Sequence, residues 1–277
     1  MIASFLLALR EGLEAALIVG LTIGVLTKMN RREQVPAVWA GVGVATAVSV
    51  GAAIILQLVG AELEGAAEQI FEGVTMFLAS AVLTWMIFWM ARQGRRVQDE
   101  LQTDVKTALA RGGRWGLFAI AFFAVVREGI ETALFLTAAA MTSSAQQVLI
   151  GGLAGLAGAA VLGWLLFATA VRLNVRRFFQ VTSVLLILFA AGLMAHGIHE
   201  FNEAGLIPSI IEHVWDMNHI LDENSAVGVT LKALFGYNGN PSLTEILGYV
   251  AYYVAIFLGL RQAERRTTAV VREPAVS

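Results

Sequence analysis

The sequence has 277 residues, of which 57% are hydrophobic and only 14% are charged, and its mean hydropathy is +0.71. Such an apolar composition excludes an ordinary soluble domain, and a formal net charge of −2 with scattered basic residues gives no support for nucleic-acid binding. The absence of cysteine excludes disulfides and thiolate ligands, so any metal must be bound by oxygen or imidazole.

Seven apolar stretches follow one another along the chain, each about 20 residues or longer, which is the length a helix needs to cross a bilayer. They predict transmembrane helices at residues 3–28, 37–60, 69–92, 115–140, 146–171, 178–200 and 243–261. We expect no cleaved signal peptide, because no basic region precedes the first stretch. The predicted fold class is therefore an all-α polytopic membrane protein.

Charged residues alternate between the connections in a way that predicts the orientation. Basic residues follow the odd-numbered stretches: Lys28, Arg31 and Arg32; Arg92, Arg95, Arg96, Lys106, Arg111 and Arg114; Arg172, Arg176 and Arg177; Arg261, Arg265, Arg266 and Arg272. Since basic loops stay in the cytoplasm, we expect the N-terminus outside and the C-terminus inside. Residues 265–277 are expected to be a short disordered end.

A nine-residue motif occurs twice, at residues 9–17 (LREGLEAAL) and 126–134 (VREGIETAL), 117 residues apart. Each copy opens a group of three stretches, so the two groups enter the membrane with opposite polarity and form an inverted 3+3 repeat followed by a seventh helix. The predicted organisation is a first repeat at 1–92, a cytoplasmic basic loop at 93–114, a second repeat at 115–200, an extracytoplasmic loop at 201–242, the seventh helix at 243–261 and a cytoplasmic tail at 262–277.

The repeated motif places charged side chains deep in two apolar stretches. They are Arg10, Glu11 and Glu14 in the first copy and Arg127, Glu128 and Glu131 in the second. A charge at this depth costs at least about 2.5–3.5 kcal/mol, so these side chains must face one another, water or an ion. Spacings of three and four residues put each trio on one helical face, and Gly12 and Gly129 are expected to let the two helices approach closely.

Four glutamates and two arginines sum to −4 + 2 = −2, a balance that suits a bound cation. Carboxylate oxygens are hard ligands for iron(III) and also serve iron(II), manganese, magnesium or calcium, so charge alone does not choose among them. The arginines would hold the glutamates ionised and weaken binding enough for release. The alternative is that each trio is a structural ion-pair lock that touches no substrate.

Further candidate ligands lie at the predicted outer ends of two stretches. Glu72 opens the third stretch, and His196, His199, Glu200 and Glu203 close the sixth. The residues that close the sixth stretch are either ligands at the mouth of the pathway or interfacial residues hydrated by the headgroup region. Glu72 is either such a ligand or a helix-start carboxylate favoured by the helix dipole. In the outer loop, Asp216, Asp222 and Glu223 are candidates for capturing cations, although such residues are usually only solvated.

The doubled R-E-G-x-E motif resembles that of the oxidase-dependent iron permeases of fungi and their bacterial Efe-type relatives. The resemblance covers nearly the whole chain and extends to residues 71–73 (Phe-Glu-Gly), 215–216 (Trp-Asp), 236–237 (Gly-Tyr) and 241–242 (Pro-Ser). It implies that Glu11, Glu14, Glu128 and Glu131 are required for iron uptake. It also implies partner proteins: a multicopper ferroxidase beside the fungal members, and a periplasmic iron-binding protein and a haem peroxidase beside the bacterial ones.

The sequence therefore predicts an iron permease of the cell membrane, the bacterial inner membrane, and not an enzyme. We expect iron, ferric or ferrous, as the transported substrate, with no permanently bound cofactor and no nucleic-acid partner; a homo-oligomer is compatible with the sequence. The alternatives are a membrane-embedded metalloenzyme, disfavoured because the spacing of common zinc and di-iron motifs is absent from the sequence, and a proton or cation channel that uses the same glutamates.

Overall fold

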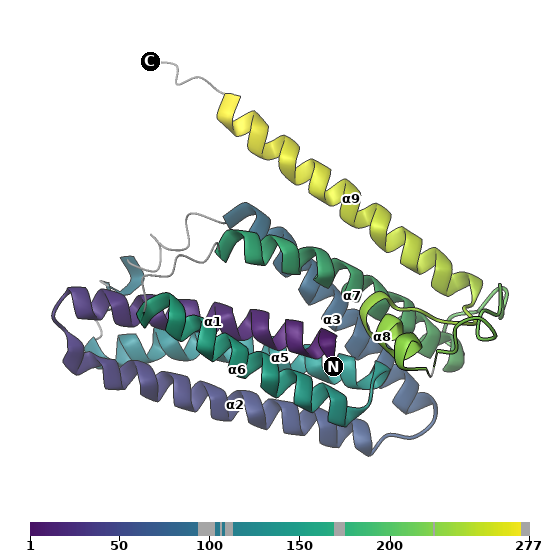
Figure 1. Cartoon of the computed structure of the whole chain (residues 1–277), viewed down its shortest axis with the longest axis horizontal. Coiled ribbons are helices and arrows are strands. Elements are labelled where there is room, and N and C mark those ends of the chain that lie inside the picture. Colours follow the sequence, from purple (N-terminus) through teal and green to yellow (C-terminus); the bar gives the residue numbers. More distant parts are fainter. Residues whose placement is uncertain (94–102, 106, 109–112, 169–174, 224, 273–277) are drawn as a thin grey trace. The chain divides into compact units, whose positions relative to one another are not determined.

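Long α-helices make up most of the chain in the computed structural model, which describes residues 1–93, 103–105, 107–108, 113–168, 175–223 and 225–272. The elements are α1 (Ile2–Lys28), the 3-10 helix η1 (Arg32–Gln34), α2 (Val35–Ala61), α3 (Ala66–Gln93), α5 (Gly113–Thr142), α6 (Ala145–Ala168), α7 (Val175–Glu203), α8 (Ala226–Phe235) and α9 (Leu243–Arg272) (Figure 1). These described ranges contain no strand, which confirms the predicted all-helical class for this part of the chain.

Each predicted stretch coincides with a long helix, and five of these helices are long and apolar enough to cross a membrane. The five candidate spans are Arg32–Ala61, Ala66–Met90, Ala145–Phe167, Arg177–Glu203 and Leu243–Gln262. Helices α1 and α5 are also long, with 27 and 30 residues, but each carries a charged trio in its middle. That these two helices also cross the membrane stays a prediction.

The described helices group into two compact units. Unit 1 comprises Met1–Glu64 and Arg95–Leu185, and unit 2 comprises Gly65–Gly94 and Leu186–Ser277. Unit 1 therefore holds α1, α2, α5 and α6, whereas unit 2 holds α3, most of α7, α8 and α9. Each unit combines elements from both predicted repeat copies, so neither unit corresponds to one copy.

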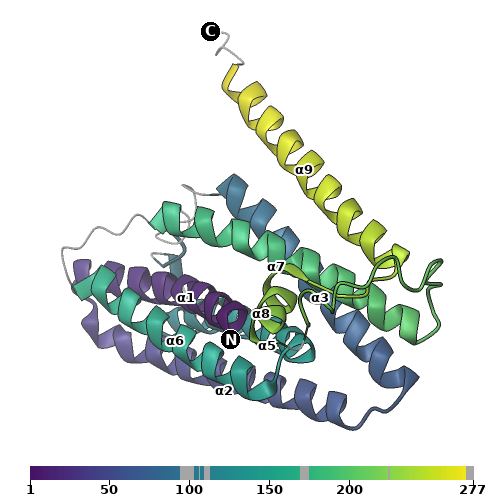
Figure 2. The same ribbon diagram turned by 45° about the vertical axis from the view of Figure 1, so that its right-hand side comes forward.

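In unit 1, α1 packs along α6, and α2 packs along α5 (Figure 2). Helices α1 and α6 are parallel, because their contacts advance together: Gly155 faces Phe5 and Ala8, and Gly163 faces Ala16. Only residues 143 and 144 separate α5 from α6, so these two helices form an antiparallel hairpin. Consequently α1 and α5, which also contact each other, run in opposite directions (Figure 1).

The close contacts of unit 1 occur in matched sets. Gly12 on α1 faces Ala159 on α6, and the equivalent Gly129 on α5 faces Ser49 on α2. In the same way, Gly151 on α6 faces Met1 and Ser4 at the start of α1, and Gly41 on α2 faces Phe118 and Ala121 on α5. The matched residues of α1 and α5 are 117 positions apart (129 − 12 = 117), and those of α2 and α6 are 110 positions apart (159 − 49 = 110). The helix pair α1 and α6 is thus packed through the same residue positions as the pair α5 and α2.

Unit 2 is built on α3 and α7, with smaller contributions from α8 and α9. Ser80 on α3 donates a hydrogen bond of 2.9 Å to the carbonyl oxygen of Ala190 on α7, and the hydroxyls of Thr84 and Tyr252 lie 2.8 Å apart, which joins α3 to α9. The rings of Phe77 on α3 and Phe201 on α7 are stacked, with their centroids 5.3 Å apart. The hydroxyls of Ser80, Thr84 and Tyr252 therefore have hydrogen-bond partners within the unit.

Residues 226–235 form a helix within a segment for which the sequence analysis predicted only a loop. Ser225 caps α8 by accepting a hydrogen bond of 3.0 Å from the Gly228 amide, and Gly236 ends it in the left-handed conformation with φ of 69°. This pair of capping residues was the available signal. It was missed because the apolar residues between the caps are too few for a span.

The end of the chain corrects one expectation. Helix α9 continues to Arg272, so the predicted disorder from residue 265 is wrong for residues 265–272. Residues 262–272 contain neither glycine nor proline, and a helix that has already formed extends easily through such a segment. Residues 273–277 lie outside the described residues, as do Arg95, Arg96, Lys106, Arg111 and Arg172, which entered the orientation argument.

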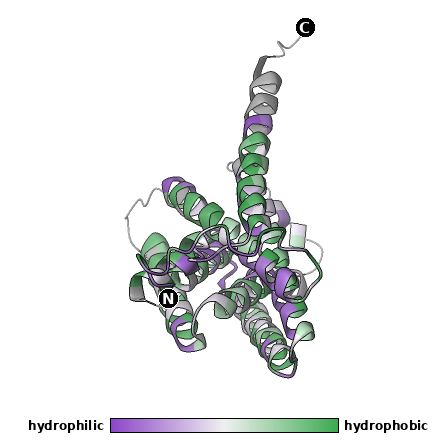
Figure 3. Cartoon of the chain, turned by 90° about the vertical axis from the view of Figure 1, so that its right-hand side faces the viewer, coloured by the Kyte–Doolittle hydropathy of each residue, from purple (hydrophilic) through white to green (hydrophobic). Residues whose placement is uncertain are grey.

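Large apolar side chains are exposed along the helices, where hydrophobic colour predominates (Figure 3). On α2, Ile55 and Leu58 are about three-fifths exposed, at 62% and 59%, and Trp39 is 56% exposed. A soluble domain would bury such a continuous surface, whereas lipid solvates it without cost. These surfaces agree with a multi-pass membrane protein.

The glycine contacts of unit 1 generate a stability prediction. In Gly155→Ala, the new methyl group would lie 2.8 Å from the Leu9 amide nitrogen on α1, so we expect a loss of about 1–3 kcal/mol. Gly43→Ala on α2 is the matched control, because no atom lies within 4 Å of its new methyl group; we expect no loss, or a gain of up to about 1 kcal/mol. Thermal unfolding in detergent measures both, and equal midpoints for the two variants would contradict this packing.

Candidate metal-binding site between helices α1 and α5

The first charged trio is enclosed within unit 1. The Arg10 guanidinium lies 3.3 Å from Glu11 Oε1 through Nη1 and 3.4 Å from Glu14 Oε1 through Nη2. The side chains of Arg10 and Glu11 are 0% exposed, and that of Glu14 is 11% exposed. The Phe179 ring lies over the guanidinium, 5.9 Å from its centre, so Arg10 is held by two carboxylates and an aromatic face.

The second trio has the same internal pairing but a more open arginine. Arg127 Nε donates a hydrogen bond of 3.1 Å to Glu131 Oε1 and lies 3.6 Å from Glu128 Oε1. Glu128 and Glu131 are nearly buried, whereas the Arg127 side chain is 38% exposed. Both trios therefore form the intrahelical ion pairs that their spacing predicts, in different surroundings.

Three glutamates from the two helices converge. One carboxylate oxygen from each of Glu11, Glu128 and Glu131 lies within 4.8 Å of the other two, and all three residues are buried. We call these residues the carboxylate cluster. Within the part of the chain that the structure describes, it is the one group of three acidic, histidine or cysteine side chains placed to hold a metal ion.

Glu14 flanks the carboxylate cluster without being one of its three members. Its carboxylate is paired with Arg10 and lies near enough to Glu131 and Arg127 on α5 to interact with both electrostatically. The four glutamates and two arginines predicted from the repeated motif therefore occupy one neighbourhood in unit 1.

The carboxylate cluster retains unused ligand atoms. Among the described residues, the Oε2 atoms of Glu11, Glu128 and Glu131 have no hydrogen-bond donor, although each is buried. A buried carboxylate oxygen without a donor is costly, and proximity of three such groups adds repulsion. A cation bound by these oxygens would remove both penalties, so the donor set is suited to a hard metal ion.

The role predicted for the two glycines is wrong in one respect. Gly12 packs against Ala159 of α6, and Gly129 packs against Ser49 of α2, so neither mediates the approach of α1 to α5. At 100° per residue, Gly12 lies about 160° around the helix from Glu14 and about 100° from Glu11, so it does not share the face of the carboxylates. The glycines instead seat the outer helices α6 and α2 against the helices that carry the charges.

Five residues predicted at the mouth of the pathway lie in unit 2. His199 Nε2 is 3.2 Å from Glu203 Oε1, and Glu72 on α3 interacts electrostatically with Glu200 on α7. His196 is buried, with Nδ1 3.0 Å from the carbonyl oxygen of Gly192. The structure thus brings His199 together with Glu203 and places Glu72 near Glu200, whereas His196 faces its own helix.

The acidic residues of the outer loop make local contacts with the backbone of the loop. Asp216 Oδ1 accepts a hydrogen bond of 2.9 Å from the Asn218 amide, and Glu223 Oε2 lies 3.4 Å from the Gly239 amide. Asp222 accepts a hydrogen bond through its backbone carbonyl from Ser225. Each of these residues shapes a local turn, and their capture role stays a prediction.

Sequence reasoning missed Glu245, which is the most connected carboxylate of unit 2. Its side chain is 4% exposed and accepts hydrogen bonds of 3.1 Å from the Ser242 amide and 2.8 Å from Asn238, and it lies 3.1 Å from His199 Nδ1. The available signal was a carboxylate in the first turn of an apolar stretch. It was passed over because a glutamate at a helix start has an ordinary explanation.

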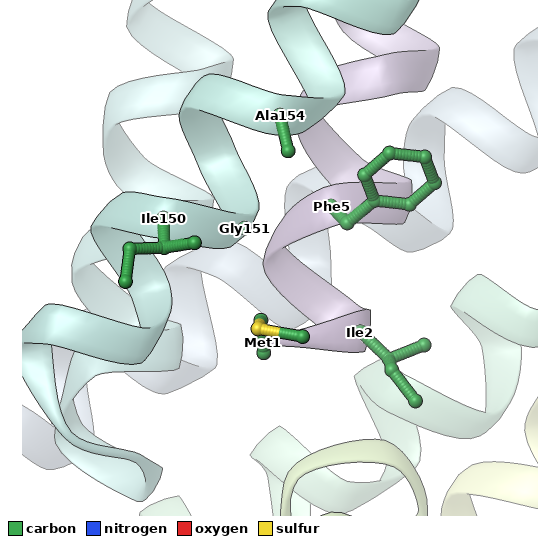
Figure 4. A pocket seen from close by; sticks show the side chains of 6 residues that line it. All are labelled: Met1, Ile2, Phe5, Ile150, Gly151 and Ala154. Atoms are coloured by element: carbon green, nitrogen blue, oxygen red, sulfur yellow. The ribbon is translucent and has the colours of Figure 1, made fainter.

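A pocket beside the N-terminus offers no comparable chemistry. It has a volume of about 280 Å³ and is lined by Met1, Ile2, Phe5, Ile150, Gly151 and Ala154 (Figure 4). The side chains around it are apolar, so it has no acidic or imidazole ligand for a cation. The carboxylate cluster remains the candidate site of unit 1.

Apolar helices with exposed hydrophobic surfaces and a buried set of converging carboxylates define a polytopic membrane protein with an internal charged site. The chain belongs to the Iron permease FTR1 family, whose model matches residues 1–270. It is 39% identical to the ferrous iron permease EfeU of Escherichia coli O6:H1 (strain CFT073), over 92% of this chain and 93% of that protein. It is 36% identical to the ferrous iron permease EfeU of Yersinia pestis, over 92% of this chain and 91% of that protein. No solved structure matches the chain.

Family membership supports iron transport by a membrane permease and confirms the resemblance found from the doubled motif. The relatives are named as permeases, in agreement with a protein that is not an enzyme. The family assignment does not depend on the geometry of the carboxylate cluster. The two observations are therefore independent.

The unequal burial of the two arginines generates a second prediction. Arg10→Met leaves Glu11 buried without its counter-charge, so we expect a loss of about 3–5 kcal/mol of stability. Arg127→Met should cost clearly less, because the half-exposed Arg127 leaves its partners closer to a polar environment. Thermal unfolding of the two purified variants in one detergent measures the difference. Equal losses, or a larger loss for Arg127→Met, would show that the enclosure of the first trio is not what stabilises it.

Proposed function

We propose that this protein is a permease that carries ferrous iron into the cytoplasm, and that the ion binds to the carboxylate cluster between α1 and α5. The observation that carries this proposal is the convergence of Glu11, Glu128 and Glu131 within 4.8 Å in the middle of two long helices. Three carboxylates in an apolar unit have no evident structural need for one another. They do form a ligand set for a cation.

The charge of the site favours a divalent ion. With all six side chains of the two trios ionised, their charges sum to −2, so one iron(II) ion neutralises them, whereas iron(III) leaves an excess positive charge in an apolar unit. The related EfeU proteins are named ferrous iron permeases, which supports the same choice. The carboxylate oxygens alone would accept either oxidation state.

The two arginines supply the means of release. In the absence of the ion, Arg10 and Arg127 compete for the carboxylates through the contacts of 3.1–3.6 Å described above. A transport site must bind strongly enough to admit the ion and weakly enough to let it leave. Because the two guanidinium groups can replace the iron ion as partners of the carboxylates, they keep the affinity of the site low enough for release.

The matched contacts of unit 1 support an inverted repeat, in which the pair α1 and α6 is related to the pair α5 and α2. Inverted repeats allow a central site to be exposed alternately to the two sides of a membrane. In the proposed orientation the N-terminus is outside and all seven long helices cross the bacterial inner membrane. The periplasmic partners implied by the family resemblance would then meet the protein on the side of the membrane where α1 begins and α5 ends.

Uptake of radioactive iron(II) into proteoliposomes under anaerobic conditions tests the proposed site. We expect Glu11→Gln, Glu128→Gln and Glu131→Gln each to reduce the initial rate at least about tenfold, because each removes a charged ligand. Glu14→Ala extends the series to the flanking carboxylate. Glu33→Gln is the matched control: this exposed residue pairs with Arg31 on the surface, and its uptake should equal that of the unmodified protein. Unchanged uptake in the three cluster variants would remove the proposed pathway.

The oxidation state is tested with the same vesicles. Iron supplied with ascorbate should be taken up much faster than the same concentration of iron(III) citrate, because the site balances a charge of +2. Competition with manganese and zinc in parallel assays measures the selectivity against other divalent ions. Faster uptake from iron(III) citrate without any reductant would contradict the charge argument.

A further inference from the structure

A chain of polar side chains joins three helices of unit 2, at the end where α3 and α9 begin and α7 ends. Gln69 donates a hydrogen bond of 3.0 Å to Glu203 Oε2, and Glu203 Oε1 lies 3.2 Å from His199 Nε2. The other ring nitrogen, His199 Nδ1, lies 3.1 Å from Glu245 Oε1, and Glu245 Oε2 accepts a hydrogen bond of 2.8 Å from Asn238. We call these five residues the histidine network.

The two sides of the His199 ring differ in accessibility. Glu245, on the Nδ1 side, is 4% exposed and is fixed by Asn238 and by the Ser242 amide. Glu203, on the Nε2 side, is 51% exposed. Metal-binding histidines commonly donate one N–H to a buried carboxylate, which orients the ring and leaves the other nitrogen as an accessible ligand. Glu245 and His199 have this arrangement, with Glu203 beside the second nitrogen.

We propose that His199 Nε2 and Glu203 form a second, weaker binding site for divalent cations, and that Glu245 orients His199 for this role. Glu200, one residue along from His199, and Glu72 place two further carboxyl groups at the same end of the unit. The proposal rests on the function proposed above, since the site would supply iron(II) to the pathway. An imidazole ligand favours iron(II) over iron(III), in keeping with the charge balance of the carboxylate cluster.

A purely structural role explains the contacts of Glu245 and the hydrogen bond from Gln69 on α3 to Glu203 on α7, but not the contact between His199 and Glu203. Glu245 fixes α9 and the segment before it, and this role needs nothing on the Nε2 side of the ring. The pair formed by His199 and Glu203 is a partly exposed contact between neighbours on one helix, and such contacts contribute little stability. A nitrogen and a carboxylate held 3.2 Å apart at an accessible position are better explained as two ligands for one ion.

Binding of iron(II) to the purified full-length protein tests this site, by anaerobic equilibrium dialysis in a Glu11→Gln/Glu128→Gln background that disables the carboxylate cluster. The background should retain one weak site, which His199→Ala and Glu203→Gln should each abolish. Glu245→Gln keeps a hydrogen-bond acceptor but removes the charge, and should weaken binding about 10- to 100-fold. Glu33→Gln should leave binding unchanged. Size-exclusion chromatography and circular dichroism establish whether each variant is folded. If His199→Ala unfolds, Glu203→Gln still tests the site, because Glu203 is 51% exposed and its substitution should not disturb the fold.

Uptake kinetics with an intact carboxylate cluster provide the second measurement. Glu203→Gln should raise the KM for iron(II) about tenfold or more with little change in the maximal rate, whereas a merely structural role would leave the KM unchanged. Two results would contradict the second site. One is that the Glu11→Gln/Glu128→Gln protein binds no iron(II), and the other is that it binds iron(II) with an affinity that neither His199→Ala nor Glu203→Gln changes. Neither result affects the proposed function, which fails only if the cluster variants transport iron normally.

Discussion

The structure of unit 1 depends on the need of six charged side chains in two apolar helices to satisfy one another. Two ion-pair trios meet where α1 and α5 cross in opposite directions, and α6 and α2 cover the outer faces of these helices through Gly12 and Gly129. No single helix could carry such charges through an apolar environment. The internal pairing therefore fixes which helices are central.

The two trios are alike in pairing and unlike in surroundings, and this difference bears on transport. Arg10 is enclosed beneath Phe179, whereas Arg127 is partly exposed. In the proposed inverted repeat, this difference would leave one side of the carboxylate cluster more open than the other. Exchange of the two environments would open the site to the opposite side, while the carboxylates keep their positions.

The sequence predicted much of this arrangement because its signals are local. Runs of apolar residues located the helices, and the three- and four-residue spacing within each trio predicted its ion pairs. The partners of Gly12 and the bond between His199 and Glu245 were not predictable, because they join residues far apart in the sequence and depend on which helices become neighbours. The short helix α8 was missed for a different reason: its capping residues are distinctive, but its apolar run is too short to stand out.

The central claim is that iron is bound by glutamates from both copies of the repeated motif. X-ray absorption spectroscopy of the His199→Ala protein loaded with one equivalent of iron(II) tests it most directly, because the second proposed site is then disabled and the carboxylate cluster is the stronger site. The account predicts a shell of oxygen ligands without nitrogen, and its disappearance when either Glu11 or Glu128 is changed to glutamine. An iron signal that persists unchanged in both glutamine variants would contradict it.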